Sequence, residues 1–485
     1  MRFRPPFDKD RSRLTRMPSP DLVIAVLAFA GMCASFMQTI LLPIQSELPV
    51  LLGASRDVTA WVVTVTLLVA AICTPISGRL GDMYGKKNVA LVLLGLLVLG
   101  SVVAALSPSV LLLIVGRGLQ GMGMGVVPLG ISILRDVLHR DRLGSGIALV
   151  SATLGVGGAL GLPISAFVTE RYDWHVVFWV AAGLGLVALA LVAWVVPVST
   201  LRTGGRLDAV GVAGLAVGLT GVLLAVSRGN DWGWGSPRTL GLLVGGVAVL
   251  LVWGWYELRV TEPLVDLRVT ARGTVLFTNL ASIAMGFSLF ASNVVFPQLL
   301  ELPTAAGGLG LTLMQASLVL MPSGLVMLAM SPVAGRLEHR IGPKPLLASG
   351  AAVIAVSYVI AVVVDLDVWS VLVVNVVVGV GIGLGFAAMP ALIMRVVPAH
   401  ETGAANGLNT LMRSLGTTSA AAVVGGVLAS GGAQLDGVPV PSDDAFRTAL
   451  LLGLLASVVC TVLALLIPRP SPPAHEHPSL PDGVL

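Results

Sequence analysis

The sequence predicts an all-α integral membrane protein with fourteen transmembrane helices. Of its 485 residues, 56% are hydrophobic and 11% are charged, and the mean hydropathy is +0.94. A soluble protein carries about 25% charged residues, so most of the surface of this chain must face something other than water. The charged residues gather in short stretches between apolar runs, and these runs reach the length of about 20 residues that crosses a bilayer.

Two copies of one short charged turn reveal the internal organisation. The first is Gly78–Lys87, GRLGDMYGKK, and the second is Gly335–Lys344, GRLEHRIGPK. Each reads G-R-L, four residues, Gly, and Lys within the next two positions. Segments Gly146–Gly155 and Gly407–Gly416 match in the same way. Because self-similarity at a fixed spacing indicates a duplicated unit, we expect two pseudo-symmetric six-helix bundles.

Fourteen apolar runs are each long enough to span a membrane, and few charges interrupt them. In chain order they cover residues 21–44, 57–78, 89–107, 109–133, 144–168, 174–197, 208–227, 239–257, 273–299, 312–334, 345–364, 368–396, 405–429 and 445–467. Six runs belong to each repeated half, and the seventh and eighth lie between the halves as an inserted pair.

These runs divide the chain into five parts. We expect an N-terminal tail at 1–20, a six-helix bundle at 21–199, a linker with two extra helices at 200–265, a second six-helix bundle at 266–467, and a C-terminal tail at 468–485. The C-terminal tail is rich in Pro, His and Ser, which predicts disorder.

The distribution of Lys and Arg predicts the orientation. Most of the 29 Lys and Arg residues lie in the tails and loops on one side of the predicted membrane. The positive-inside rule places that side in the cytoplasm, together with both termini and both charged turns. The net charge of +4 arises from these loops and does not indicate a nucleic-acid partner. We expect a multi-pass monomer in the cell membrane.

The first turn contains more than a topology signal needs. Gly78 and Gly85 allow a tight turn and close approach of helices. Asp82 can lie against a helix N-terminus, where the partial positive charge favours a carboxylate. The alternative is that the basic residues only set topology. Because that alternative gives Asp82 no role, we favour a contact between the halves.

The turn fits the pattern G-x-L-x-D-x-x-G-[RK]-[RK], and with the six-plus-two-plus-six arrangement the chain resembles the major facilitator superfamily, in its fourteen-span drug:proton antiporter branch. The resemblance covers almost the whole chain. It implies that Asp82 contacts the start of a span in the second half, near Thr402–Ala404. It also implies that Lys86 pairs with Asp136, and that these contacts form a latch that holds the halves together in an outward-open state. The latch residues by resemblance are Gly78, Arg79, Asp82, Gly85, Lys86, Lys87 and Asp136.

The second copy of the turn departs from the family pattern. It has Glu338 and His339 where the first copy has Gly81 and Asp82. We therefore expect its latch to be weaker or different.

Arg117 lies deep in the run at 109–133, where a charge is expensive unless it faces a polar cavity or a partner. The stretch Arg117–Gly121 matches the family motif R-x-x-Q-G, and the resemblance links Arg117 to proton coupling, with Gln120 as a further candidate. The alternative is that Arg117 joins helices by bonds to carbonyl groups and to Gln120. Arg413 is the counterpart in the second half.

Asn406, Asn409 and Arg413 fall on one helical face. Polar groups that share a face of a membrane helix are expected to point inward. Two interpretations stay open: a role in coupling or the cavity, and a structural network that closes the second bundle.

Gly155, Gly157, Gly158, Gly161 and Pro163 resemble the family's antiporter motif, which ends in G-P-x-x-G-G. Here Leu162 separates Gly161 from Pro163, and the trailing glycines are absent. Glycines three or four positions apart also let helices pack closely, and packing alone explains each of these residues.

The fourteen-span branch usually has an acid in its first span, in a D-x-T pattern, but this chain has Met37-Gln38-Thr39. None of its acids lies clearly at mid-membrane, which favours a neutral or anionic substrate and leaves the proton carrier open. The polar, Met and Phe side chains of the central runs are candidates to line the cavity. They are Met37, Gln38, Asn279, Phe287, Asn293, Gln315, Asn375, Phe386, Met389, Asn406 and Asn409.

The favoured function is secondary active transport, in which a small amphipathic or drug-like molecule is exported by proton-coupled alternating access between the two bundles. The alternative is a facilitator or importer of a small neutral or anionic molecule on the same fold. The partners would be the substrate, protons and the lipid bilayer. No His pair has metal-ligand spacing and no nucleophile lies near a base, so we expect no metal, no cofactor and no enzyme activity.

Overall fold

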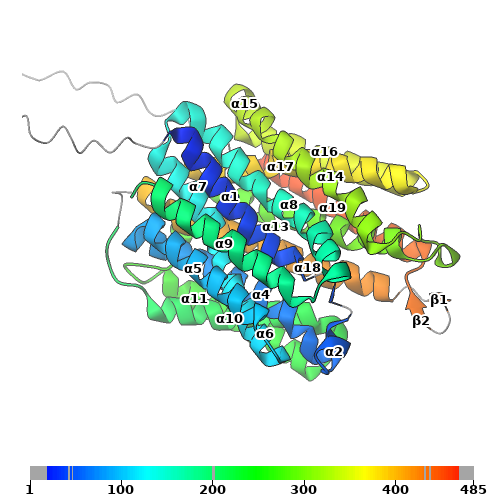
Figure 1. The fold of residues 1–485 in the computed structure, drawn as a ribbon. Helices are drawn as coiled ribbons and strands as arrows, with labels where there is room; N and C mark the ends of the chain where they lie inside the picture. Colours follow the sequence, from blue (N-terminus) through cyan, green and yellow to red (C-terminus); the bar gives the residue numbers. More distant parts are fainter. Residues whose placement is uncertain are drawn as a thin grey trace, which may run out of the picture.

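A computed structural model describes residues 19–41, 44–45, 47–198, 203–430, 433–435 and 438–468. These residues fold into helices that run side by side, and one short hairpin (Figure 1). The two predicted tails lie almost entirely outside the described residues. We call the end of the molecule that carries the Gly78–Lys87 turn the turn end.

The first half is a helical bundle with one core. Its elements are α1 (Pro20–Thr39), α2 (Leu48–Leu51), α3 (Arg56–Thr59), α4 (Trp61–Tyr84), α5 (Lys86–Ala105), α6 (Val110–Met122), the 3-10 helix η3 (Gly123–Gly125), α7 (Val126–Val137), α8 (Arg140–Arg171) and α9 (His175–Val195). Apart from Met394, the buried apolar side chains of its core cluster lie between Val23 and Val196.

The second half has its own core. Its elements are α13 (Gly273–Glu301), η4 (Thr304–Ala306), α14 (Leu313–Ala329), α15 (Ser331–Ile341), α16 (Pro343–Val363), α17 (Val368–Met394), η5 (Ala399–Glu401), α18 (Thr402–Ala429), β1 (Ala433–Leu435), β2 (Val438–Val440) and α19 (Asp443–Leu466). Its core cluster runs from Ala281 to Ile467 and also takes in Ala148 and Ala152 of α8, so the two halves touch through α8.

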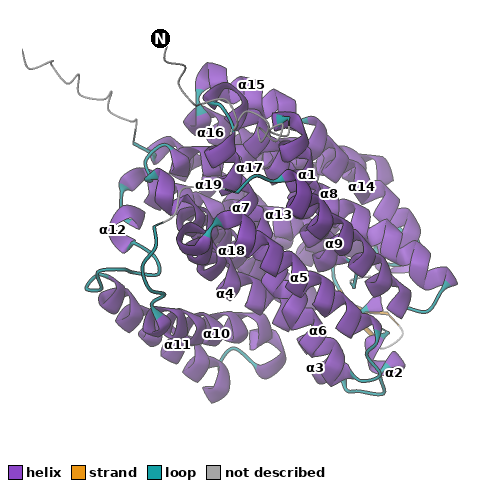
Figure 2. Ribbon diagram, turned by 60° about the vertical axis from the view of Figure 1, so that its left-hand side comes forward, coloured by secondary structure: helices purple, strands orange, loops and turns teal. Residues whose placement is uncertain are grey.

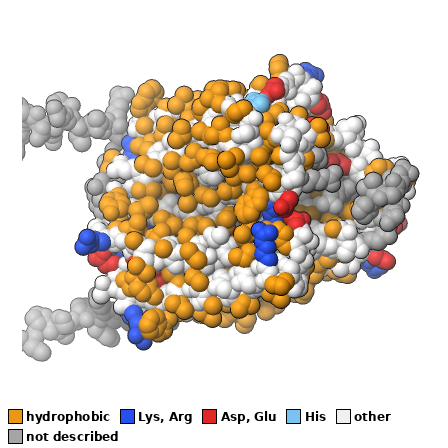
Figure 3. All heavy atoms as spheres, turned by 90° about the horizontal axis from the view of Figure 1, so that it is seen from below, with side chains coloured by type: hydrophobic (Ala, Val, Ile, Leu, Met, Phe, Trp, Pro, Cys, Tyr) orange, Lys and Arg blue, Asp and Glu red, His pale blue; other side chains and the backbone are white. Residues whose placement is uncertain are grey.

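Within the described residues, thirteen helices are long and apolar enough to cross a membrane, and the pair α14 and α15, bent by 43°, makes a fourteenth. Apolar side chains cover most of the face in Figure 3, and charged side chains lie in a few small groups. The prediction of a multi-pass helical membrane protein is therefore confirmed.

The structure adds detail that the apolar runs did not predict. The run at 109–133 divides into α6, η3 and α7 at the glycines Gly123 and Gly125, which lower helix propensity. Between α18 and α19, β1 pairs with β2 in antiparallel register, with Leu435 opposite Val438. The prediction of a purely helical chain misses this hairpin, because its strands are too short to stand out as apolar runs.

The inserted pair α10 (Ala209–Trp232) and α11 (Pro237–Glu257), followed by the short α12 (Leu267–Thr270), forms a hairpin at the margin of the bundle (Figure 2). Helix α10 contacts both α4 of the first half and α18 of the second. Only 11% of the residues in the apolar stretch of α11 are buried inside the protein, so α11 faces lipid.

Two side chains near the end of α10 fix the inserted pair to both halves. Arg228 is 1% exposed, and its guanidinium lies 3.2 Å from the Asp57 carboxylate and 3.0 Å from that of Asp231. The Asn230 amide donates to the carbonyl of Ala422 on α18 at 2.7 Å. The insert therefore bridges the two bundles on one side.

Close packing of α5 against α6 depends on glycine. A Cβ on Gly100 would lie 2.5 Å from the Gly116 carbonyl oxygen and 2.7 Å from the Gln120 nitrogen, whereas a Cβ on Gly95 would meet nothing within 4 Å. We predict that Gly100→Val lowers the thermal midpoint of the detergent-purified protein, because overpacking costs about 1–3 kcal/mol. The matched variant Gly95→Val, in the same helix, is expected to unfold at the wild-type temperature; equal midpoints for the two variants would contradict this packing.

Candidate functional site

The Gly78–Lys87 turn reaches the other half through Asp82. This residue lies in the last turn of α4 and is 1% exposed. Its carboxylate accepts hydrogen bonds from the backbone N–H groups of Gly403 at 3.1 Å and Ala404 at 2.9 Å. These N–H groups belong to the first turn of α18, where they have no intrahelical acceptor and the helix dipole is positive. One carboxylate thus joins the two halves by charge-assisted bonds.

Lys86 extends this contact. Its ammonium donates to both carboxylate oxygens of Asp136, at 2.9 and 2.8 Å, and to the Thr402 hydroxyl at 3.1 Å, and it lies 3.9 Å from Asp82. The Lys86 and Asp136 side chains are 1% and 3% exposed. Because each buried charge has an opposite partner, the cost of desolvation is largely offset. We call Asp82, Lys86, Asp136 and Thr402, with the start of α18, the cross-half network.

The backbones of α4 and α18 touch beside this network. A Cβ on Gly78 would collide with the carbonyl group of Gly403, and one on Gly407 would lie 2.7 Å from the carbonyl oxygen of Thr74. Gly85 has a φ of 102°, which lets the chain turn directly from α4 into α5. Lys87 donates to the carbonyl of Ala193 at the end of α9, within its own half, at 2.8 Å.

The second turn contacts the first half in a similar place but with fewer bonds. Gly335 packs against the backbone of Ser145 near the start of α8. The Glu338 carboxylate lies 3.7 Å from Arg395 of its own half, and a Cβ on Gly144 would lie 2.6 Å from its Oε2. That Oε2 accepts no hydrogen bond from the described residues. Glu338 thus approaches the start of α8 as Asp82 approaches the start of α18, without the two backbone bonds.

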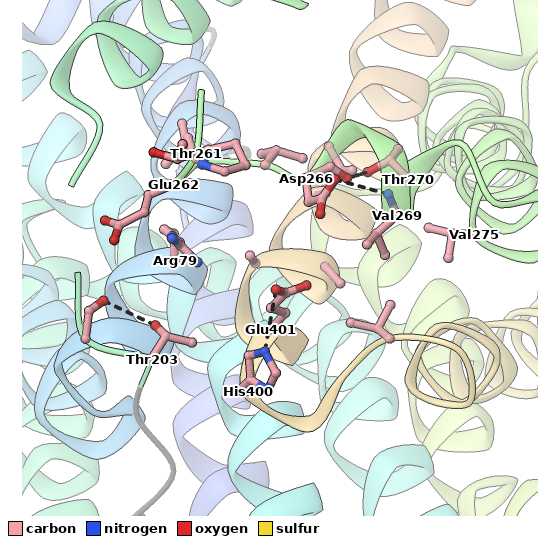
Figure 4. A pocket seen from close by; sticks show the side chains of 18 residues that line it. Arg79, Thr203, Thr261, Glu262, Asp266, Val269, Thr270, Val275, His400 and Glu401 are labelled. Atoms are coloured by element: carbon pink, nitrogen blue, oxygen red, sulfur yellow. Dashed lines mark hydrogen bonds and ion pairs between the residues drawn. The ribbon is translucent and has the colours of Figure 1, made fainter. Parts of the chain in front are cut away.

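A pocket of about 540 Å³ lies beside the cross-half network at the turn end (Figure 4). It is lined by α4, by the linkers on either side of the inserted pair, and by the start of α18. Its polar lining includes Arg79, Thr203, Thr261, Glu262, Asp266, Thr270, His400 and Glu401. The backbone N–H of Thr203 donates to the Asp82 carbonyl at 3.0 Å, so the linker is attached to the network. Among the predicted site residues, Arg79 alone lines this pocket; the linker residues follow no helical period and become neighbours only in the fold.

Arg117 is 1% exposed within the first bundle. Its guanidinium donates to the carbonyls of Met37 at 2.7 Å and Val62 at 3.4 Å, and to the Gln120 amide oxygen at 2.9 Å. The Gln120 amide in turn donates to the Ser101 hydroxyl at 2.8 Å and to the Met37 sulfur at 3.6 Å. The contacts of Arg117 and Gln120 are therefore those of a group that joins helices α1, α4, α5 and α6.

In the second bundle, α18 carries a row of polar side chains in its first half. The Asn409 amide donates to Asn279 at 3.0 Å and to Ser282 at 2.6 Å on α13. The Asn406 amide donates to the Thr402 carbonyl at 2.9 Å and to the Ser132 hydroxyl of the first half at 3.4 Å. The Arg413 guanidinium lies over the Phe386 ring, 4.7 Å from its centroid.

The remaining cavity candidates fall into three groups. Met37, Met389 and Asn375 are buried. The sulfur atoms of the two methionines accept weak hydrogen bonds, and the Asn375 amide donates to the Leu320 carbonyl at 3.1 Å. Gln38 and Phe287 are part-exposed. Two candidates are exposed: Asn293 on α13, and Gln315, whose side chain forms the capping box of α14 with Thr312. Gln315 therefore belongs to a helix end, which the residue type alone did not reveal.

The glycines of α8 pack against helices from both halves. A Cβ on Gly157 would lie 2.5 Å from the Met32 carbonyl oxygen on α1, and one on Gly161 would collide with Thr39 of the same helix. A Cβ on Gly158 would lie 3.6 Å from Thr39, and one on Gly155 would collide with Met327 of α14 in the other half. Pro163 lies inside α8 and is part-exposed. Helix α8 is thus held tightly against both α1 and α14.

Arg117 gives a prediction that separates its two interpretations. Arg117→Ala leaves the carbonyls of Met37 and Val62 and the amide of Gln120 without a buried donor, at a cost of about 1–3 kcal/mol for each unsatisfied group. We expect a lower thermal midpoint in detergent for Arg117→Ala, and a smaller loss for Arg117→Lys, which keeps the charge. An unchanged midpoint for Arg117→Ala would contradict the joining role and favour the coupling role.

Asp82 gives a second prediction. Asp82→Asn removes the charge from the acceptor of two buried hydrogen bonds. Together, these two bonds stabilise the contact by about 2 kcal/mol more with an ionised acceptor than with a neutral one. In a background without native cysteines, Ser132→Cys reports opening of the turn end, because Ser132 is buried against Asn406 of the other half. We expect its reaction with a maleimide to be several-fold faster in Asp82→Asn.

The control variant is Asp21→Asn, which removes an exposed acid that pairs with Arg142 within the first half. Its maleimide rate is expected to match the parent. Equal rates in Asp82→Asn and Asp21→Asn would show that the carboxylate of Asp82 does not hold the turn end closed.

These features define a class of membrane protein: two helical bundles of repeated sequence that meet through a buried ionic contact at one end. Comparison with known proteins gives the family. The model of the Major Facilitator Superfamily matches residues 27–418, with a second match over 278–484. The chain therefore belongs to the Major Facilitator Superfamily.

The chain is similar to several bacterial members of this family. It is 27% identical over 397 residues to the lincomycin resistance protein LmrB of Listeria monocytogenes, covering 81% of this chain and 80% of LmrB. It is 25% identical over 378 residues to the multidrug transporter protein MdtP of Bacillus subtilis, covering 76% of this chain and 68% of MdtP. A third relative, the uncharacterised transporter YhcA of Bacillus subtilis, is 25% identical over 70% of this chain, which spans 63% of the length of YhcA.

Solved structures share the fold. The human organic anion transporter MFSD10 superposes with a TM-score of 0.62 at 15% identity, covering 91% of this chain and all of MFSD10. The proton:xylose symporter XylE superposes with a TM-score of 0.61 at 14% identity, covering 90% of this chain and 94% of XylE. At these identities the likeness concerns the fold.

Proposed function

We propose that this chain is a secondary active transporter that exports a small, amphipathic or drug-like molecule by proton-coupled alternating access. Membership of the Major Facilitator Superfamily supports the transport class, and the names of LmrB and MdtP support drug-like substrates, lincomycin among them. In this proposal the two bundles, residues 21–199 and 266–467, move as units and the insert at 200–265 bridges them.

The cross-half network is the observation that carries the proposal. In alternating access, the contact that closes one end must form in one state and break in the other. The bonds from Gly403 and Ala404 to Asp82, and the contact of Lys86 with Thr402, join opposite halves at the turn end. The basic residues of the two turns support a cytoplasmic location of this end, by the positive-inside rule. The state described here is then the one closed to the cytoplasm.

The network also supplies a route by which protons could act on the closed state. Asp82 and Asp136 are the two carboxylates that surround Lys86. A proton on either carboxylate would remove one of the opposite charges that offset the burial of the Lys86 ammonium. Proton binding would therefore weaken the closed state, which is how a proton gradient would drive the conformational change.

A transport assay tests the proposal. The chain is expressed in a lincomycin-sensitive bacterium, and retention of radiolabelled lincomycin is followed with and without a protonophore. We expect lower retention than in cells with the empty vector, and loss of that difference when the protonophore is added. Asp82→Asn, at equal membrane abundance, is expected to retain lincomycin as the empty vector does, whereas Asp21→Asn is expected to behave as wild type.

Other outcomes would contradict parts of the proposal. If the protonophore does not change the movement of lincomycin, the chain is not a proton-coupled antiporter, and a facilitator on the same fold becomes the better proposal. Full export by Asp82→Asn would remove the conformational role of the network while leaving the transport class intact.

A further inference from the structure

Three arginines of long helices, Arg117, Arg228 and Arg413, differ in their partners. Arg117 donates to two carbonyls and to Gln120, and Arg228 lies beside the carboxylates of Asp57 and Asp231. Arg413 has no hydrogen bond or ion pair with any other described residue, and its guanidinium contacts the Phe386 ring instead. Arg413 is therefore the arginine whose donors are not used by the fold.

The position of Arg413 makes this unusual. It is the twelfth residue of α18, about 17 Å along the helix from its start at 1.5 Å per residue, so it lies near mid-span. A guanidinium has five N–H donors and stays charged. Such a group in a membrane helix normally pairs with another group or faces a water-filled cavity that serves as a pathway.

The side chain of Arg413 points into the protein and remains accessible. The Phe386 ring beneath it is 2% exposed and belongs to α17, in the core of the second bundle. Arg413 itself is part-exposed. The backbone of Arg413 is fixed, because Gly286 of α13 packs directly against its carbonyl oxygen.

Among the described residues, no carboxylate forms an ion pair with Arg413. One turn before Arg413 on α18, Asn409 uses its amide N–H groups on Asn279 and Ser282. Acidic residues of the described spanning helices lie toward helix ends, as Asp82, Glu257 and Glu301 do. An acceptor for Arg413 must therefore come from outside the fold.

We propose that Arg413 and Phe386 form a binding site for an anionic aromatic molecule, with the anionic group on the guanidinium and an aromatic ring beside Phe386. A guanidinium binds a planar carboxylate through two parallel bonds, which a lysine cannot reproduce. This inference rests on the proposed function, since it names the charge class of the transported substrate and the residue that selects it.

Two dyes with one ring system and opposite charge test the site. Fluorescein is an anionic xanthene with a free carboxylate, and rhodamine 123 is a cationic xanthene whose carboxyl group is esterified. Binding of each to the detergent-purified full chain is measured by fluorescence anisotropy at pH 7.4. We expect wild type to bind fluorescein at least tenfold more tightly than rhodamine 123. Arg413→Gln is expected to weaken fluorescein binding about tenfold or more, with rhodamine 123 unchanged or tighter.

The matched control is Arg340→Gln, which removes one exposed positive charge from α15 in the same half. It is expected to bind both dyes as wild type does. Arg413→Lys keeps the charge and loses the planar fork, and we expect a several-fold loss for fluorescein. If Arg413→Gln does not yield folded protein, the test rests on Arg413→Lys. Binding of fluorescein by Arg413→Lys with the wild-type affinity would overturn the proposal.

Other results would also overturn it. These are wild type binding neither dye, a preference of wild type for rhodamine 123, and equal losses for both dyes in Arg413→Gln. Because the assay uses no gradient, it is independent of transport. Arg413-dependent fluorescein binding without lincomycin export would keep this site and refute lincomycin export alone, whereas lincomycin export without such binding would refute this site alone.

Discussion

The contact between the Asp82 carboxylate and the first turn of α18 is the interaction that we expect to hold the turn end closed. It satisfies a buried charge with backbone N–H groups that the helix itself cannot use. It also requires glycine on both sides, because any side chain on Gly78 or Gly403 would hold the helices apart. Lys86 then connects this carboxylate to Asp136, so that one ionic network reaches α4, α5, α7 and α18.

The same contact explains why the two halves are similar but not equivalent at the turn end. Glu338 approaches the start of α8 from the second turn, yet its Oε2 has no hydrogen-bond partner within the described part of the chain. The acid stands one position earlier in the second turn than in the first, as the two sequences show. The first turn therefore provides most of the ionic contact between the halves, and the second provides close packing.

The fold could be predicted from the sequence because its signals are strong and local. Long apolar runs and a repeated turn indicate spanning helices and a duplicated unit without knowledge of distant contacts. The bend between α14 and α15 and the hairpin of β1 and β2 could not be predicted in this way, since the first depends on packing and the second involves short strands.

The site was harder to predict, because its residues meet only in three dimensions. The placements of Asp82 and Lys86 came from resemblance to a family, and both side chains lie where that resemblance put them, while their role stays a prediction. Residue type alone was a poor guide for Gln315, whose amide caps a helix. It was also insufficient for the arginines, since Arg117 and Arg413 look alike in sequence but differ in whether the fold uses their donors. The pocket beside Arg79 depends on linker residues that carry no periodic signal.

The distance between the halves at the turn end shows whether the Asp82 carboxylate holds that end closed. Spin labels on Tyr84→Cys of α4 and Arg340→Cys of α15, both exposed, report that distance by pulsed electron resonance. We expect one short distance for the parent and a second, longer population when Asp82→Asn is added. A single unchanged distance in both proteins would contradict it.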